Sequence, residues 1–158
     1  MADFGQLQIE AELTRLSHNF AYYMDYRKYD QLVELFMPDA LFDRILHVHK
    51  GHDEIRAGLA ERAAHILTRH VSTNFHFEHI SPDEARGVVY NMSHYGEMNP
   101  AGEAPAVFSG PGMLLEFHDR YTRTSEGWRF AERVAKAALL DAAAPMMAGG
   151  KWRPEDIS

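Results

Sequence analysis

Two residues have the chemistry of a proton-transfer pair: the carboxylate Asp25 and the imidazole His70. Asp25 lies in segment 20–36, which is crowded with aromatic residues: Phe20, Tyr22, Tyr23, Tyr26 and Tyr29. His70 lies in segment 68–74, TRHVSTN, which alternates as a β-strand does. An imidazole that is oriented by a carboxylate is a common general base. We therefore expect Asp25 and His70 to meet inside a cavity and to act together on a proton.

The same pair also has a purely structural interpretation. A buried histidine that is satisfied by a carboxylate can fasten a helix to a sheet, and structural ion pairs of this kind are common. The residues alone leave both interpretations open.

The first half of the chain is predicted to be mainly helical. From residue 6 to about residue 26, apolar residues recur at the steps of three and four that mark an amphipathic helix: Ile9, Leu13, Leu16, Phe20 and Tyr23. On a regular helix Asp25 would point away from this stripe, so we expect the helix to end or bend near Asp25. Asp30 can cap a short helix over 31–37, which Pro38 ends. A strand over 40–49 and a third helix over about 52–67 follow.

The second half is predicted to form long antiparallel strands over 68–80, 86–98, 112–123 and 128–140, with a loop over 99–111. In the first of these strands, alternation places Phe75 and Phe77 on the face opposite His70. Helices followed by strands predict an α+β fold, in which a curved, cone-shaped sheet wraps the N-terminal helices and leaves a cavity at its mouth. We expect a single domain over residues 1–140 and a tail over 141–158.

Six further residues are candidate walls of the cavity: Phe20, Tyr23, Tyr90, Met92, His94 and Phe117. For His94 the register is uncertain by one residue, and one residue changes the face. For Tyr90, Met92 and His94, the alternative is ordinary sheet core or a dimer interface. An apolar outer face of the sheet would favour a homo-oligomer, a dimer or trimer.

Composition excludes several classes of protein. The 158 residues fit one domain, and 46% of them are hydrophobic, so the chain is not disordered. A net charge of −7 argues against nucleic-acid binding. There is no cysteine, and hence no disulfide, thiolate metal site or cysteine nucleophile. Apolar runs are too short to span a membrane, and we expect a soluble cytoplasmic protein.

The chain contains one cluster that resembles a metal site. His47, His49 and His52 could bring three imidazoles together, as zinc requires. Their position at a strand end, without a nearby carboxylate, favours a solvated histidine-rich edge instead. We expect neither a metal nor another cofactor.

Four segments carry a resemblance to a known family: DYRKYDQLVELFMPDALFD (25–43), KGHDEIRAGL (50–59), TRHVSTN (68–74) and GWRFAER (127–133). Together with the order of elements, they resemble the SnoaL-like branch of the NTF2-like superfamily, over about residues 9–140. That group includes scytalone dehydratase, polyketide cyclases and a dehydrochlorinase. The resemblance implies a cone-shaped α+β barrel whose concave face lines the pocket.

The resemblance also implies roles for the pair. In catalytic members of the group, residues at the positions of Asp25 and His70 form a dyad, with the histidine as general base or acid and the aspartate fixing its tautomer. The chain departs from scytalone dehydratase itself, because Met24 replaces a tyrosine and Asp43 and Arg44 stand where a second tyrosine is expected. Scytalone is therefore not the expected substrate.

Three hypotheses for function follow. The first is a cofactor-free lyase or isomerase that removes a proton next to a carbonyl of a small, largely apolar, cyclic or aromatic substrate. The second is a protein that binds a small hydrophobic ligand without turnover. The third is a small β-type subunit of a ring-hydroxylating oxygenase.

Overall fold

The computed structural model describes residues 4–108 and 112–140, and the predicted tail over 141–158 lies outside them. The elements in chain order are α1 (Phe4–Asp25), α2 (Tyr29–Val33), β1 (Phe36–Asp43), β2 (Val48–Lys50), α3 (Gly51–Ala60), β3 (Ile66–Ile80), β4 (Glu84–Glu97), β5 (Val107–Phe108), β6 (Met113–Thr124) and β7 (Gly127–Leu140). Helices therefore come first and long strands follow, which confirms the predicted α+β fold.

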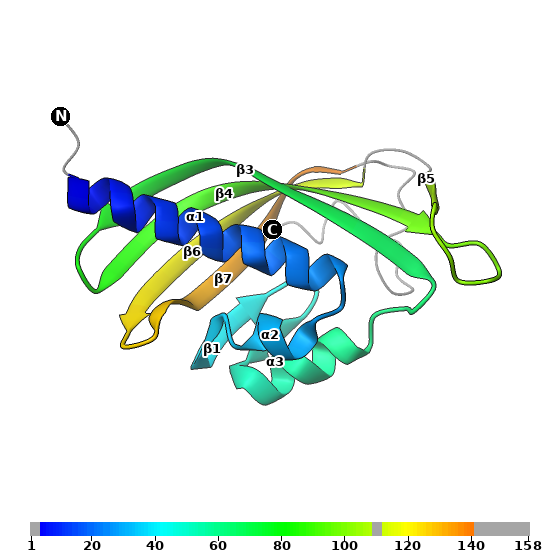
Figure 1. The fold of residues 1–158 in the computed structure, drawn as a ribbon, viewed down its shortest axis with the longest axis horizontal. Coiled ribbons are helices and arrows are strands. Elements are labelled where there is room, and N and C mark those ends of the chain that lie inside the picture. Colours follow the sequence, from blue (N-terminus) through cyan, green and yellow to red (C-terminus); the bar gives the residue numbers. More distant parts are fainter. Residues whose placement is uncertain (1–3, 109–111, 141–158) are drawn as a thin grey trace.

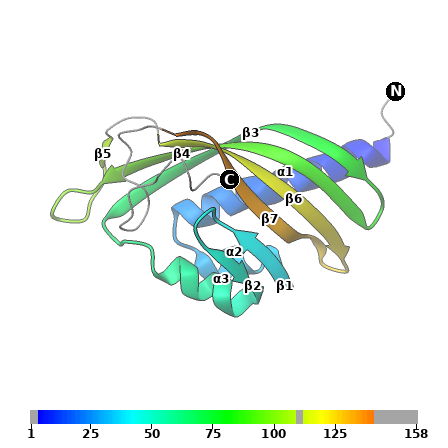
Figure 2. The same cartoon turned by 180° about the vertical axis from the view of Figure 1, so that it is seen from behind.

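The strands form one curved mixed sheet in the order β2-β1-β7-β6-β4-β3, with β5 paired to β4. β1 and β7 are parallel, and the other neighbours are antiparallel. Helix α1 lies along the concave side of the long strands, and α2 and α3 lie beside β1 (Figures 1 and 2). The sheet and helices therefore enclose an interior, as the cone-shaped fold requires.

Phe20 of α1 is the centre of the core. It is 1% exposed, and its ring makes edge contacts with four aromatic rings of the sheet: Phe36, Phe42, Phe117 and Phe130. Edge-to-face contacts of this kind add to the stabilisation that apolar burial provides. The apolar stripe of α1 is thus what anchors the helix on the sheet.

Several predicted element boundaries are wrong. Phe36 and Met37 begin β1 rather than ending a helix, and Pro38 lies in this strand, where the register between β1 and β7 shifts. A proline fits such a place because it has no N–H to donate to a neighbouring strand. The predicted Asp30 cap is also wrong, because Lys28 precedes α2 and no side chain caps that helix.

The strand and helix predicted over 40–67 are shorter in the structure. Residues 44–47 form a turn between β1 and β2, and α3 ends at Ala60 instead of near Leu67. The Arg27 guanidinium donates hydrogen bonds to the carbonyl oxygens of residues 62, 63, 64 and 66. These hydrogen bonds from a distant residue hold segment 61–65 in an irregular conformation. The sequence of the segment itself does not indicate that the helix ends there.

The predicted faces of Phe75 and Phe77 are wrong, because β3 contains a bulge. Asn74 has φ 50°, and the register with β4 shifts between Thr73 and His76. An extra residue in a strand turns every later side chain to the other face. Phe75 therefore contacts the His18 ring of α1, at 5.4 Å between centroids, on the same inner face as His70.

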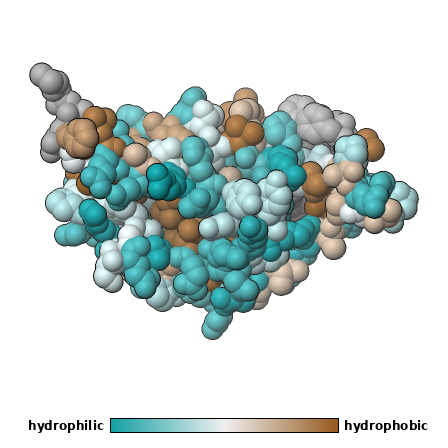
Figure 3. Space-filling model, in the orientation of Figure 1, coloured by the Kyte–Doolittle hydropathy of each residue, from teal (hydrophilic) through white to brown (hydrophobic). Residues whose placement is uncertain are grey.

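The outer face of the sheet carries a row of apolar side chains on four neighbouring strands. Val71 pairs with Met92, Met92 with Leu114, and Leu114 with Leu139. The side covered by α1 and α3 is mostly hydrophilic, with apolar residues at the start of α1 and smaller apolar patches elsewhere (Figure 3). Within the described ranges no helix is long and apolar enough to cross a bilayer.

Candidate active site

Asp25 is the last residue of α1, so the predicted end of the helix at this residue is confirmed. The chain turns there because Arg27 takes a left-handed conformation, with φ 53°, and the Lys28 N–H donates to the Tyr23 carbonyl at 2.9 Å. A left-handed residue of this kind commonly closes a helix. The turn releases Asp25 from the regular helical wheel and lets its carboxylate reach β3.

Asp25 and His70 form a close, buried pair. The His70 Nδ1 atom lies 2.5 Å from Asp25 Oδ1, and the backbone N–H of His70 donates to Asp25 Oδ2 at 2.9 Å. The two side chains are only 9% and 7% exposed. With the carboxylate as acceptor, Nδ1 carries the proton, and Nε2, on the far side of the ring, keeps its lone pair. This geometry fixes both the orientation and the tautomer of the imidazole.

Thr68 and Arg62 extend this pair into a longer polar chain. The Thr68 hydroxyl donates to Asp25 Oδ1 at 3.0 Å and accepts from Arg62 Nη2 at 2.9 Å. Arg62 Nη1 donates to the Met24 carbonyl at 2.9 Å and to the Tyr29 hydroxyl at 3.2 Å. The sequence did not identify Arg62 as a site residue, because its pattern predicts that Arg62 lies inside a helix.

A cavity of about 360 Å³ opens beside this polar chain. Its lining consists of Arg27, Arg44, Ile45, Leu46, His47, Gly58, Glu61, Arg62, Ala63, His65, Ile66, Thr68, Tyr95, Glu97 and Met113. Thr68 connects the cavity with the Asp25–His70 pair, because it lines the cavity and His70 lies two residues further along the inner face of β3. Two residues of a strand span roughly 7 Å. Neither Asp25 nor His70 is among the described residues that line the cavity.

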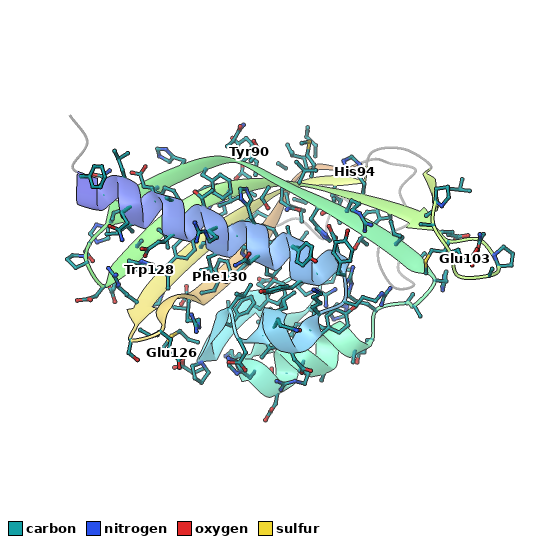
Figure 4. The ribbon with its side chains drawn as sticks, in the orientation of Figure 1. Tyr90, His94, Glu103, Glu126, Trp128 and Phe130 are labelled. Atoms are coloured by element: carbon teal, nitrogen blue, oxygen red, sulfur yellow. The ribbon has the colours of Figure 1, made fainter. Side chains whose placement is uncertain are left out.

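The six candidate wall residues lie elsewhere in the structure. Phe20 and Phe117 are buried in the aromatic core, and Tyr23 packs against it. Tyr90, Met92 and His94 alternate with the buried Asn91 and Ser93, which places them on the outer face of β4. Figure 4 shows Tyr90 and His94 on the side of the sheet away from α2 and α3. The lining formed by the described residues includes none of the six.

Tyr95, and not its neighbour His94, faces the inner side of β4. The sequence left this open because the predicted register was uncertain by one residue. It pairs directly with Thr68 across β3 and β4 and lines the cavity. Burial raises the pKa of Tyr95 to about 12, against smaller opposing effects of Ser93, Arg62 and Arg44. At neutral pH its hydroxyl is therefore a hydrogen-bond donor. The alternation of β4 could have identified it from sequence if the register had been known.

The three histidines of the predicted edge do not converge. The rings of His47 and His49 lie 6.3 Å apart, but His52 Nε2 contacts the Phe36 carbonyl oxygen at 2.9 Å. In the part of the chain that the structure describes, no three His, Asp or Glu side chains are placed to hold a metal ion. The described side chains in and beside the cavity offer carboxylate, imidazole, guanidinium and phenol groups.

Proteins of known structure share this fold. A candidate scytalone dehydratase from Novosphingobium aromaticivorans is 16% identical, with a TM-score of 0.71 over 93% of this chain and 95% of that chain. ActVI-ORFA from Streptomyces coelicolor is 18% identical, with a TM-score of 0.68 over 83% and 98% of the two chains. A hexachlorocyclohexane dehydrochlorinase is 16% identical, with a TM-score of 0.71 over 94% and 98%.

These similarities establish the fold, and the sequence itself establishes the family. No curated protein matches the chain in sequence. Residues 5–134, however, match the model of the SnoaL-like domain. Since this match covers most of the chain, the protein belongs to the SnoaL-like domain family.

Proposed function

We propose that the protein is a cofactor-free lyase or isomerase in which His70 moves a proton and Asp25 orients it. The observation that carries this proposal is the 2.5 Å contact between His70 Nδ1 and Asp25 Oδ1 in a nearly closed environment. A buried imidazole with a fixed tautomer is ready to accept a proton at Nε2. Membership of the SnoaL-like family, and the similarity of this fold to those of a candidate dehydratase and a dehydrochlorinase, agree with this chemistry.

The reaction begins at a carbon next to a carbonyl group. His70 Nε2 takes the proton from this carbon, and the C–H bonding electrons form an enolate. In an elimination, the enolate electrons then form a carbon–carbon double bond while the leaving group departs with its own bonding pair, and the imidazolium returns the proton to it. In an isomerisation, the proton returns to a different carbon. Throughout, Asp25 stays ionised and balances the positive charge of the imidazolium.

The polar chain around Asp25 supports this role. Thr68 and the His70 backbone occupy one oxygen each of the carboxylate, so the carboxylate cannot rotate away from the ring. Catalytic geometry depends on such supporting contacts, since small displacements of a general base are costly. The substrate would lie in the adjacent cavity, with its acidic carbon beyond Thr68 and toward His70.

The second candidate is binding of a small hydrophobic ligand without turnover. It is favoured by one observation, namely that the described cavity lining stops at Thr68 and does not reach His70. In that case the Asp25–His70 contact would only join α1 to β3. The two proposals differ in whether a bound compound ever exchanges a proton.

Proton exchange provides the test. Small enolisable and β-hydroxy carbonyl compounds would be incubated with the protein in D₂O, and loss of the α-proton signal followed by NMR. We expect Asp25→Asn and His70→Ala each to slow exchange by roughly 10²-fold or more, and the double variant to be no slower than either, because the two residues act as a unit. His76→Ala, an exposed histidine of the same strand, is the matched control.

The outcomes separate the two candidates. Exchange that survives both substitutions would rule out the dyad as the base. Compounds that bind to the wild-type protein but never exchange a proton would identify a ligand-binding protein instead.

A further inference from the structure

The cavity is lined by three arginines, although the protein carries a net charge of −7. These arginines are Arg27, Arg44 and Arg62. None of them forms an ion pair with a carboxylate within 4 Å among the described residues. Partly buried arginines usually have an anionic partner, because a charge is costly to remove from water. Each of the three therefore calls for an explanation.

Arg27 and Arg62 are explained by the hydrogen bonds they donate within the protein. Arg27 holds the carbonyl oxygens of segment 62–66 and the Tyr29 hydroxyl. Arg62 donates to Met24, Tyr29 and Thr68. Both guanidinium groups thus have fixed structural partners.

Arg44 is different, because it makes one side-chain hydrogen bond in the described part of the chain. Its Nη1 atom donates to the Gly58 carbonyl at 3.2 Å. A guanidinium has five N–H donors, so most of its capacity is unused. The residue is held firmly all the same: its backbone N–H donates to the His47 carbonyl at 2.9 Å, and the Asp43 carboxylate accepts from the Ile45 N–H at 2.8 Å.

Among the described residues, Arg44 has no carboxylate within ion-pair distance. Burial, and next the positive charge of Arg62, lower the pKa of Arg44, while Tyr29, Glu61 and Tyr95 act weakly in the opposite direction. An arginine nevertheless remains charged at neutral pH. Glu61 and Glu97 also line the cavity, but neither lies within ion-pair distance of Arg44.

A second donor faces the same space. The buried Tyr95 hydroxyl makes no hydrogen bond of ordinary geometry with the described residues. The Ser93 hydroxyl opposes the rise of the Tyr95 pKa and donates its own proton to Asn91, so toward Tyr95 it can act only as an acceptor, and the two hydroxyls do not meet in hydrogen-bond geometry. The cavity therefore holds a charged planar donor with one acceptor, the Gly58 carbonyl, and a neutral donor that makes no hydrogen bond of ordinary geometry with the described residues.

We propose that Arg44 binds a carboxylate group of the substrate, with the Tyr95 hydroxyl as an additional donor. The ligand class is a small organic acid. Its apolar body would lie against Ile45, Leu46, Ile66 and Met113, which line the same cavity. A guanidinium matches a carboxylate because two parallel N–H groups can bind both oxygens. This inference rests on the proposed use of the cavity for substrate, but it does not depend on turnover.

Matched acid and amide probes test the proposal without knowledge of the substrate. Binding of 2-naphthoate and 2-naphthamide would be measured by isothermal titration calorimetry. For the wild-type protein we expect the acid to bind at least ten-fold more tightly than the amide. Arg44→Gln should weaken binding of the acid ten-fold or more and change binding of the amide less than two-fold. Arg86→Gln, an exposed arginine on the outer sheet face, is the matched control and should change neither.

Thermal unfolding separates a binding role from a structural one. Because Arg44 is partly buried and has no carboxylate partner within ion-pair distance among the described residues, Arg44→Met should leave the melting temperature unchanged or raise it, while abolishing the preference for the acid. A variant that fails to fold would mean that Arg44 is structural and would overturn the proposal, as would equal binding of acid and amide by the wild-type protein or binding of neither.

The proposal and the dyad can fail separately. If His70→Ala still prefers the acid and also exchanges the α-proton as fast as the wild-type protein, the carboxylate site stands and the dyad mechanism fails. If proton exchange depends on His70 but Arg44→Gln leaves the preference for the acid intact, the carboxylate site fails and the dyad stands.

Discussion

Neutralising Asp119 of β6 should destabilise the fold strongly, because its carboxylate forms a buried ion pair with Arg133 of β7. Its carboxylate accepts from Arg133 Nε at 2.9 Å and Nη2 at 2.7 Å, and from the Tyr121 hydroxyl at 2.8 Å. Both charged side chains are completely buried. Removing one partner of such a pair costs about 3–5 kcal/mol, because the other charge remains buried without compensation.

The aromatic rings around Arg133 reduce this cost. Its guanidinium carbon lies 4.4 Å from the ring centroid of Phe20, 4.3 Å from that of Phe117 and 4.0 Å from that of Phe130. Desolvated cation–π contacts of this kind contribute up to about 2 kcal/mol. We therefore expect Asp119→Asn to lower the free energy of unfolding by about 3 kcal/mol, the lower end of the range.

Urea denaturation would measure this change. For a domain of this size, a loss of about 3 kcal/mol also corresponds to a fall of roughly 6–12 °C in melting temperature. The matched control is Glu132→Gln, which removes the partner of Arg120 at 2.8 Å in a pair that is 41% and 44% exposed. Such an exposed pair contributes less than about 1 kcal/mol. A loss for Asp119→Asn no larger than that of the control would refute the reasoning.

Three further predictions concern Arg27, Tyr95 and the outer face of the sheet. Arg27→Met removes the hydrogen bonds to the segment after α3, and it should lower the free energy of unfolding by about 2 kcal/mol and make segment 61–65 sensitive to limited proteolysis. Unchanged cleavage would show that these hydrogen bonds do not hold the segment. Burial raises the pKa of Tyr95 to about 12, so the fold favours its neutral form. The stabilisation this provides is complete below about pH 10 and is lost as the pH rises through 12. Tyr95→Phe should flatten the pH dependence of unfolding between these values, and an identical slope would contradict the assignment. Self-association remains a prediction: Met92→Glu should give a monomer by light scattering if the apolar row of the outer face is the interface, and an unchanged mass would exclude this surface.

Much of the fold follows from periodic patterns in the sequence. The apolar stripe of α1, the long alternating strands and the turn signals between them predict an α+β sheet with helices on its concave side. The end of α1 at Asp25 was also predictable, because a regular helix would have pointed this carboxylate away from the stripe.

The remaining errors come from contacts that local sequence does not encode. The bulge at Asn74 depends on one residue adopting φ 50°, and it reverses the faces of Phe75 and Phe77. The irregular segment after α3 depends on Arg27, which lies 35 or more residues earlier. The inner position of Tyr95 depends on strand register, which sequence alone leaves open by one residue.

In strand β6, the lining of the proposed binding cavity and the buried core lie at different ends. The inner face of the strand begins at Met113, which lines the cavity, and continues to Phe117 and Tyr121, which are buried in the core. Substitutions near Met113 can therefore alter ligand preference while the packing around Phe20 and Arg133 stays intact. This separation would let one scaffold acquire new specificities through changes at its open end, and it marks that end as the place for redesign.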